Sequence, residues 1–136
     1  MTDVSCALIV GKTGKILVTQ RGPAMRLPLK WEFPGGKVEI GETAADCVIR
    51  EIGEELNLKV NITGTFTSYV HGEGDQAIRL IPFLCEITEG EIKLAEHAAF
   101  QWLFPKELLA LDWAEADLPI VNDYLNSWLK SEEKGG

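Results

Sequence analysis

Basic residues are scarce in this chain. It has 13 Lys and Arg residues against 21 Asp and Glu residues, so its formal net charge is −8 at pH 7. Proteins that bind duplexes without sequence preference rely on Lys and Arg to neutralise phosphates. The charge balance therefore argues against a nucleic acid polymer as partner. It still allows a small phosphorylated ligand whose charge is met locally by a metal ion.

Cysteine is also rare, and long apolar runs are absent. The three cysteines, Cys6, Cys47 and Cys85, lie far apart and form no C-x-x-C pair, which argues against a disulfide framework and against a zinc site. No apolar run is long enough to span a membrane. The first residues, Met-Thr-Asp, lack the basic start of a signal peptide. We therefore expect a cytoplasmic protein with reduced cysteines and no membrane partner.

The length and composition fit one globular domain. A chain of 136 residues, with 46% hydrophobic and 25% charged residues, can build a single hydrophobic core but not two. We expect one domain over residues 1–130. Residues 131–136 are polar and end in glycine, so we expect them to form a flexible C-terminal tail.

The most informative stretch is residues 35–58, which read GGKVEIGETAADCVIREIGEELNL. The part from Thr43 to Leu56 contains no proline and predicts a helix, with Thr43 as its N-cap and Asp46 in the position of a weak capping box. At helical spacing, five apolar residues share one arc and are expected to face the core: Ala45, Val48, Ile49, Ile52 and Leu56.

Three carboxylates, Glu51, Glu54 and Glu55, occupy a neighbouring arc of this helix at i, i+3 and i+4. Like charges at this spacing repel one another, and a hard divalent cation such as Mg²⁺ would remove the repulsion. Taken alone, three Glu would equally suit a solvated acidic face. The fixed intervals to Gly36 and Arg50 favour a metal site instead.

This pattern resembles the signature of the Nudix hydrolases, Gly-x5-Glu-x7-Arg-Glu-U-x-Glu-Glu-x-Gly-U, in which U is aliphatic. Here the signature runs from Gly36 through Glu42 and Arg50 to Leu58. Its one departure is Asn57 in place of the late glycine. That position follows the helix, where Asn is the usual second choice for a left-handed residue.

Further features resemble the MutT-like nucleoside triphosphate pyrophosphohydrolases within this family. They are Arg21, the run WEFPGGK, the segment E-H-x-x-x-x-W over 96–102, and the stretch ADLP over 116–119. The last two also resemble the branch that acts on CTP and modified pyrimidine nucleotides, as well as the branch that acts on oxidised dGTP.

The remaining sequence predicts mixed strands and a second helix. Residues 4–10 and 15–20 predict a β-hairpin, and residues 21–30 form a basic loop, which is either solubilising or a positive arm for a phosphate or base.

Trp31 and Phe33 should share one face of a short strand. Further strands are expected over 59–70, 77–87 and 99–103, and helices over 105–111 and 118–129, the last with Leu118, Val121, Leu125 and Trp128 facing the core.

These elements predict an α+β fold, because regular βαβ alternation is missing. The resemblance implies the Nudix fold, an α/β/α sandwich with a mixed β-sheet between helices. It also implies hydrolysis of a nucleoside triphosphate to monophosphate and pyrophosphate, with Mg²⁺ as cofactor and Mn²⁺ as a substitute.

The resemblance assigns roles to residues at the phosphate end. Glu54 and Glu55 are implied as the principal metal ligands, joined by the carbonyl of Gly35. Glu51 is implied as a ligand or as the general base. Arg50 would hold a nearby carboxylate, and Glu42 would steady the loop.

Glu96 would be a further ligand or would support one, although an ordinary loop Glu fits its position too. Its neighbour, His97, is expected to be structural.

The base end of the site is more open. Asp117 matches a base-contacting position, and an Asp there accepts hydrogen bonds, which suits the exocyclic amine of cytosine. It would equally serve as the N-cap of the last helix. Phe33 either stacks on a base or fills the core, and Arg21 contacts either a base or a phosphate.

We therefore expect a hydrolase that favours pyrimidine triphosphates such as CTP, dCTP or their modified forms. The alternatives are a pool-cleansing hydrolase for 8-oxo-dGTP, a non-catalytic nucleotide sensor, and a hydrolase of sugar nucleotides or ADP-ribose. The sequence leaves open the base, the sugar, the metal count, the general base, and whether the protein is a monomer or a homodimer.

Overall fold

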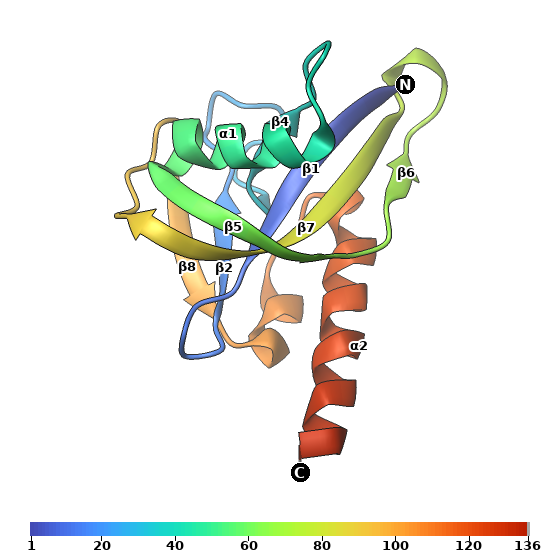
Figure 1. The fold of residues 1–136 in the computed structure, drawn as a ribbon. Helices are drawn as coiled ribbons and strands as arrows, with labels where there is room; N and C mark the ends of the chain where they lie inside the picture. The colour runs from blue at the N-terminus through green and yellow to red at the C-terminus, as the bar shows by residue number, and fades with distance from the viewer. Residues whose placement is uncertain (136) are drawn as a thin grey trace.

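The larger of two sheets forms the middle of the molecule (Figure 1). Its strands in chain order are β1 (Thr2–Ile9), β4 (Gly35–Lys37), β5 (Leu58–Thr65), β6 (Tyr69–His71) and β7 (Ile78–Gly90). They are arranged β4-β1-β7-β5, and β6 also pairs with β7. The β1–β7 pair is parallel and the other pairs are antiparallel, so the sheet is mixed. The computed structural model describes residues 1–135, and Gly136, the end of the expected tail, lies outside them.

A smaller sheet lies beside it. It consists of β2 (Ile16–Gln20), β3 (Trp31–Glu32) and β8 (Ala99–Leu103), in the order β3-β2-β8. Among the described residues, the helices are α1 (Ala44–Leu56) and α2 (Leu118–Gly135), and there are three 3-10 segments: η1 (Gly74–Gln76), η2 (Pro105–Ala110) and η3 (Glu115–Asp117). No helix within residues 1–135 is long and apolar enough to cross a membrane.

The side chains of β1 alternate between two hydrophobic cores. Cys6 and Leu8 join a core that includes α2 and the smaller sheet, whereas Ala7 and Ile9 join a core with α1 and β7. Both faces of the larger sheet are therefore covered, one by each helix (Figure 1). This arrangement is the expected α/β/α sandwich.

The predicted hairpin between residues 4–10 and 15–20 is wrong. β1 pairs with β4 and β7, whereas β2 pairs with β3 and β8, and a single Val10–Ile16 bridge connects the two segments. The reason is that β1 is apolar at consecutive positions, 6–9, all of them buried. A strand that is buried on both faces belongs in the middle of a sheet, beside a parallel neighbour.

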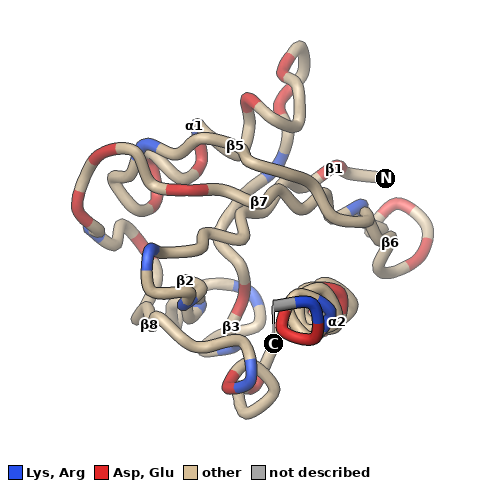
Figure 2. The backbone as a smooth tube through the Cα atoms, turned by 60° about the horizontal axis from the view of Figure 1, so that its bottom comes forward, with Lys and Arg blue, Asp and Glu red and all other residues tan. Residues whose placement is uncertain are grey.

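The helix α1 forms as predicted. The Thr43 side chain accepts a hydrogen bond from the Asp46 amide (3.0 Å), and Asn57 adopts the left-handed conformation with φ 61° and ψ 33°. The predicted core face is wrong at Ile49, which is 41% exposed, while Cys47 is buried instead. Figure 2 shows acidic positions on α1 and on the loop that precedes it.

The second helix is longer than predicted. Of its predicted core face, Val121 is buried and Leu125 packs against the core, whereas the prediction is wrong at Leu118. α2 continues past residue 129 through residues 131–135, which were expected to be a tail. Leu118 is 38% exposed, while Ile120 and Tyr124 are buried with Val121. The expected strand over 59–70 is two strands, β5 and β6, because the chain between them leaves the ladder.

Candidate active site

Two glycines bring β4 close to β1 and α1. A Cβ at Gly35 would overlap the carbonyl oxygen of Ser5, and a Cβ at Gly36 would overlap the carboxylate of Glu51. The first glycine therefore permits the pairing with β1. The second leaves space for a carboxylate that points from α1 toward the β4 backbone.

We expect Gly36→Ala to lower kcat by about 10-fold or more, because the new methyl group must displace the Glu51 carboxylate. Gly64→Ala is the matched control, since a Cβ at Gly64 meets only the Leu84 side chain at an ordinary 3.7 Å. Steady-state hydrolysis rates of the two folded variants are compared. Equal rates would show that the position of the Glu51 carboxylate does not affect turnover.

Arg50 forms hydrogen bonds with three carboxylates of the loop before α1 and of α1 itself. Its Nε and Nη2 atoms bind both oxygens of Glu42, at 2.7 and 3.0 Å, and its Nη1 atom lies 2.7 Å from Glu51 Oε1 and 3.2 Å from Glu54 Oε2. The Arg50 hydrogen bonds, aided by the Glu39 amide, lower the pKa of Glu42 to about 2. Arg50 therefore connects the loop before α1 to the acidic face of the helix.

The three carboxylates of α1 do not share one environment. Glu54 is 60% exposed and turns toward Arg50, whereas Glu55 is half-buried and its Oε2 atom has no hydrogen-bond partner. Burial, followed by the negative charges of Glu51 and Glu32, raises the pKa of Glu55 to about 8. Within residues 1–135, no three His, Cys, Asp or Glu side chains stand close enough to hold a metal ion as they are placed.

A second charged group was not predicted from the sequence. Glu32 lies between Arg21 Nη1, 2.6 Å from its Oε1 atom, and His97 Nε2, 2.8 Å from its Oε2 atom. The run Trp-Glu-Phe could have indicated that Glu32 needs charged partners. Strand alternation places Glu32 on the face opposite the two buried aromatic residues, and a charged residue there needs partners.

Glu96 lies between β7 and β8, outside α1. Its side chain is exposed. Its backbone, however, passes close to the site, because the neighbouring Ala95 amide donates to the Glu55 carbonyl (3.1 Å) and the Ala98 amide donates to the Gln20 carbonyl (2.9 Å). The structure thus brings the backbone next to Glu96 to the end of α1, while the Glu96 side chain belongs to no group of three potential metal ligands within residues 1–135.

Asp117 is buried beside Phe33. It is 6% exposed, and its Oδ2 atom accepts a hydrogen bond from the Phe33 amide (2.9 Å) rather than capping α2. Burial, with the charge of Glu32 as a smaller cause, raises the pKa of Asp117 to about 8. Phe33 itself is buried and packs against Trp113 with ring centroids 4.9 Å apart, which supports its core role.

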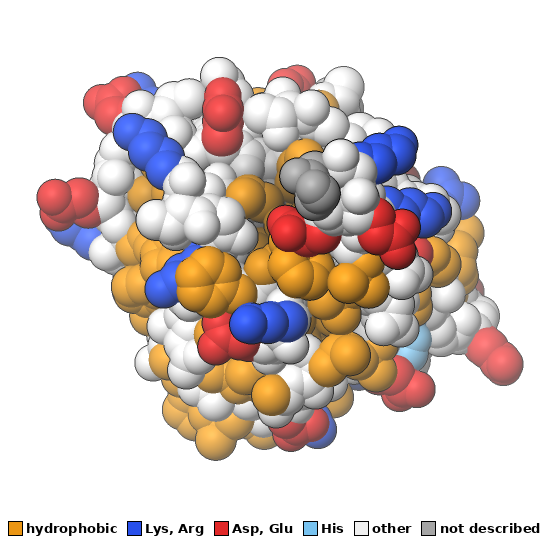
Figure 3. All heavy atoms as spheres, turned by 90° about the horizontal axis from the view of Figure 1, so that it is seen from below, with side chains coloured by type: hydrophobic (Ala, Val, Ile, Leu, Met, Phe, Trp, Pro, Cys, Tyr) orange, Lys and Arg blue, Asp and Glu red, His pale blue; other side chains and the backbone are white. Residues whose placement is uncertain are grey.

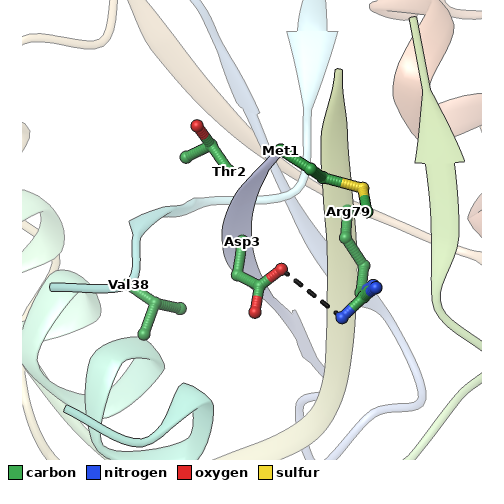
Figure 4. Close-up of a pocket in the computed structure, with 5 residues that line it drawn as sticks. All are labelled: Met1, Thr2, Asp3, Val38 and Arg79. Carbon is green, nitrogen blue, oxygen red and sulfur yellow. Dashed lines mark ion pairs between the residues drawn. The ribbon is translucent and has the colours of Figure 1, made fainter. Parts of the chain in front are cut away.

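Two surface hollows lie elsewhere on the molecule. One, of about 520 Å³, is lined by Met1, Thr2, Asp3, Val38 and Arg79, and an Asp3–Arg79 ion pair of 3.7 Å spans it (Figure 4). The other is an apolar groove between η2 and α2, on the face where hydrophobic side chains are visible in Figure 3. Neither contains a residue that was predicted for the site.

Comparison with known proteins identifies the family. A model of the NUDIX domain matches residues 1–124. The CTP pyrophosphohydrolase of Escherichia coli (strain K12) is 31% identical over 119 residues, which cover 88% of each chain. The 8-oxo-dGTP diphosphatase of the same strain is 30% identical over 119 residues, covering 88% of this chain and 92% of that one.

The fold agrees with a solved relative. The solution structure of MutT from methicillin-resistant Staphylococcus aureus 252 is 39% identical and superposes with a TM-score of 0.75, covering 93% of this chain and 96% of the other. The expected Nudix fold is therefore confirmed. Members of this family generally use divalent metal ions. The chain belongs to the Nudix hydrolases and is a hydrolase that acts on phosphoric anhydrides.

Proposed function

We propose that this enzyme hydrolyses nucleoside triphosphates to monophosphates and pyrophosphate in the presence of Mg²⁺, with pyrimidine substrates such as CTP, dCTP or their modified forms preferred. One observation carries the choice of base. Asp117, which matches a base-contacting position of the MutT-like enzymes, is a buried carboxyl group whose Oδ2 atom is already held by the Phe33 amide. The other oxygen remains available to a ligand.

The chemistry of Asp117 suits cytosine. A carboxylate only accepts hydrogen bonds, whereas a protonated carboxyl group also donates one. Because its pKa is raised to about 8, Asp117 is mostly neutral at pH 7. In that form it can accept from the exocyclic amine of cytosine and donate to the adjacent ring nitrogen. The similarity to the CTP pyrophosphohydrolase supports the same assignment.

The carboxylates of α1 suit a divalent cation. Glu55 Oε2 is a buried oxygen without a partner, and the missing side chain of Gly36 leaves space at the Glu51 carboxylate. These two residues would hold Mg²⁺ with the carbonyl of Gly35. Glu54 and Glu96 are exposed, so they would join by rotation of their side chains. The ion would neutralise the charge that the phosphates bring into an acidic site.

Cationic side chains would position the rest of the reaction. Arg50 orients the carboxylate of Glu51, which would act as a ligand or would accept the proton of the attacking water. Arg21 is partly exposed and is held by Glu32 through Nη1, which leaves its Nη2 atom available for a phosphate or base. These residues orient the triphosphate, and orientation with charge stabilisation supplies most of the rate in phosphoryl transfer.

A second candidate function is the hydrolysis of 8-oxo-dGTP. Its support is the 30% identity to the 8-oxo-dGTP diphosphatase of Escherichia coli, which is nearly as high as that to the CTP enzyme. The two substrate classes place the same demands on the metal end and differ only at the base.

A hydrolysis screen tests the proposal. CTP, dCTP, methylated dCTP, 8-oxo-dGTP and the common triphosphates are incubated with Mg²⁺, and monophosphate and pyrophosphate are measured separately. We expect release of pyrophosphate and a kcat/KM for the best pyrimidine at least about 10-fold above that for 8-oxo-dGTP. The reverse order would establish the second class. Release of single phosphate, or no turnover of any triphosphate, would overturn the proposal.

A further inference from the structure

A short segment, residues 93–98, connects the end of α1 to the end of β2. At one end the Lys93 amide donates to the Leu56 carbonyl (3.0 Å) and the Ala95 amide to the Glu55 carbonyl (3.1 Å), where α1 finishes. At the other end the Ala98 amide donates to the Gln20 carbonyl (2.9 Å), where β2 finishes. Glu96 lies between these attachments.

Within this segment, His97 is the residue that is anchored inward. Ala95, Glu96 and Ala98 are exposed, whereas the side chain of His97 is 1% exposed. Its Nε2 atom lies 2.8 Å from Glu32 Oε2, and because a carboxylate only accepts, the imidazole donates this bond. The Nδ1 atom is buried and has no partner.

The anchor of His97 is itself fixed. The other oxygen of Glu32 binds Arg21 at 2.6 Å, and the Glu32 carbonyl accepts a hydrogen bond from the Thr19 hydroxyl (3.2 Å). The Glu96 carbonyl also lies against Gly22, where a Cβ would stand only 2.5 Å from the oxygen. The backbone of Glu96 is therefore confined on the β2 side as well as at Glu55.

We propose that His97 is a positioning residue for divalent metal binding. Its hydrogen bond to Glu32 fixes the backbone of the adjacent Glu96 beside the end of α1, from where the exposed Glu96 carboxylate would rotate toward the ion held by Glu51 and Glu55. The inference rests on the proposed function, in which Glu96 is a ligand. If His97 only filled the core, its substitution would lower the stability of the fold. It would then weaken metal binding no more than other cavity-forming substitutions do.

Direct Mn²⁺ binding tests the inference without any reaction. Free Mn²⁺ is followed by its electron paramagnetic resonance signal, with the whole protein and no nucleotide. We expect His97→Leu to weaken Mn²⁺ binding roughly 10-fold, as loss of a residue that orients a ligand does elsewhere. His97→Gln retains a donor at a similar reach and should bind within about 3-fold of the wild type. His71→Gln, at the exposed histidine of β6, is the matched control.

A double substitution separates positioning from general destabilisation. In a Glu96→Gln background, His97→Leu should weaken Mn²⁺ binding no further, because the carboxylate that it positions is gone. If His97→Leu does not fold, His97→Asn, which is too short to reach Glu32, replaces it. Unchanged Mn²⁺ binding in the folded variant, or effects that add in the double variant, would overturn the inference. A wild-type protein that binds no Mn²⁺ would instead overturn the metal site of the proposed function, and the inference with it.

Discussion

Glu55→Gln is expected to lower kcat by about 10²- to 10³-fold and, at the same time, to stabilise the protein above neutral pH. The loss of rate follows because the neutral amide of Gln binds a divalent cation more weakly than a carboxylate does, and that cation would stabilise the charge that develops on the phosphates. The Oε2 atom of Glu55 is buried and unpaired, so no other residue takes its place. An opposite effect on activity and stability is typical of a group that is retained for function.

The gain in stability follows from the sign of the pKa change. The pKa of Glu55 is raised from its ordinary 4.5 to about 8 in the folded protein, mainly by burial. Between these pH values the unfolded chain has released its proton and the folded chain has not, so the free energy of unfolding falls as pH rises. The penalty is absent below 4.5 and complete above 8, and the neutral Gln never incurs it.

The measurements are kcat with the best triphosphate and thermal unfolding at pH values below 4.5 and above 8, without metal. Glu89→Gln is the matched control, because Glu89 is 71% exposed and pairs with Lys59 on the surface. Added Mg²⁺ should raise the unfolding temperature of the wild type but not of Glu55→Gln, since a ligand stabilises only the state that binds it. An unchanged kcat in both Glu55→Gln and Glu54→Gln would refute the acidic metal site.

The local sequence was sufficient to predict α1 and its ends. A hydroxyl N-cap at Thr43 and a left-handed Asn57 depend on residues within a few positions of the helix. The burial of the helix depends on the sheet that it packs against. Periodicity therefore predicted Val48, Ile52 and Leu56 correctly and failed at Ile49, which lies at the edge of the covered arc.

The pairing of strands required long-range information. Two apolar runs around a Gly-containing turn satisfy the local pattern of a hairpin, yet β1 and β2 belong to different sheets. What decides between the two arrangements is whether one face or both faces of β1 are covered. That depends on α1 and α2. Because both helices lie outside the turn segment, the sequence of the turn does not report whether they cover β1.

The charged group around Glu32 has the same limitation. Its three members, Arg21, Glu32 and His97, are up to 76 positions apart, counting from 21 to 97, and no motif spacing relates them. They meet because β2 pairs with β3 and the segment before β8 returns to the end of β2. The signature predicted the α1 carboxylates because a single helix sets their spacing, but it did not predict that Glu54 and Glu55 would differ in burial.

Asp117→Asn is expected to lower kcat/KM for the preferred pyrimidine triphosphate by about 10²-fold or more, with a smaller change for 8-oxo-dGTP. A buried group that pairs with a base rejects ligands that cannot complete its hydrogen bonds. With the Asn oxygen bound to the Phe33 amide, the Asn NH2 group would face the base, and an NH2 group only donates, so it cannot accept from the exocyclic amine of cytosine. The Asn oxygen can still accept from the Phe33 amide, so the fold should be retained.

Stability provides an independent readout of Asp117→Asn. The pKa of Asp117 is raised from 3.8 to about 8, chiefly by burial, so the wild type loses free energy of unfolding as pH rises through that window. Each pKa unit corresponds to about 1.4 kcal/mol, so the variant should be more stable by a few kcal/mol above pH 8 and nearly unchanged below pH 3.8. Asp75→Asn, in the exposed η1 segment, is the control. A variant that gains stability but keeps its pyrimidine preference would mean that Asp117 serves the core rather than the base.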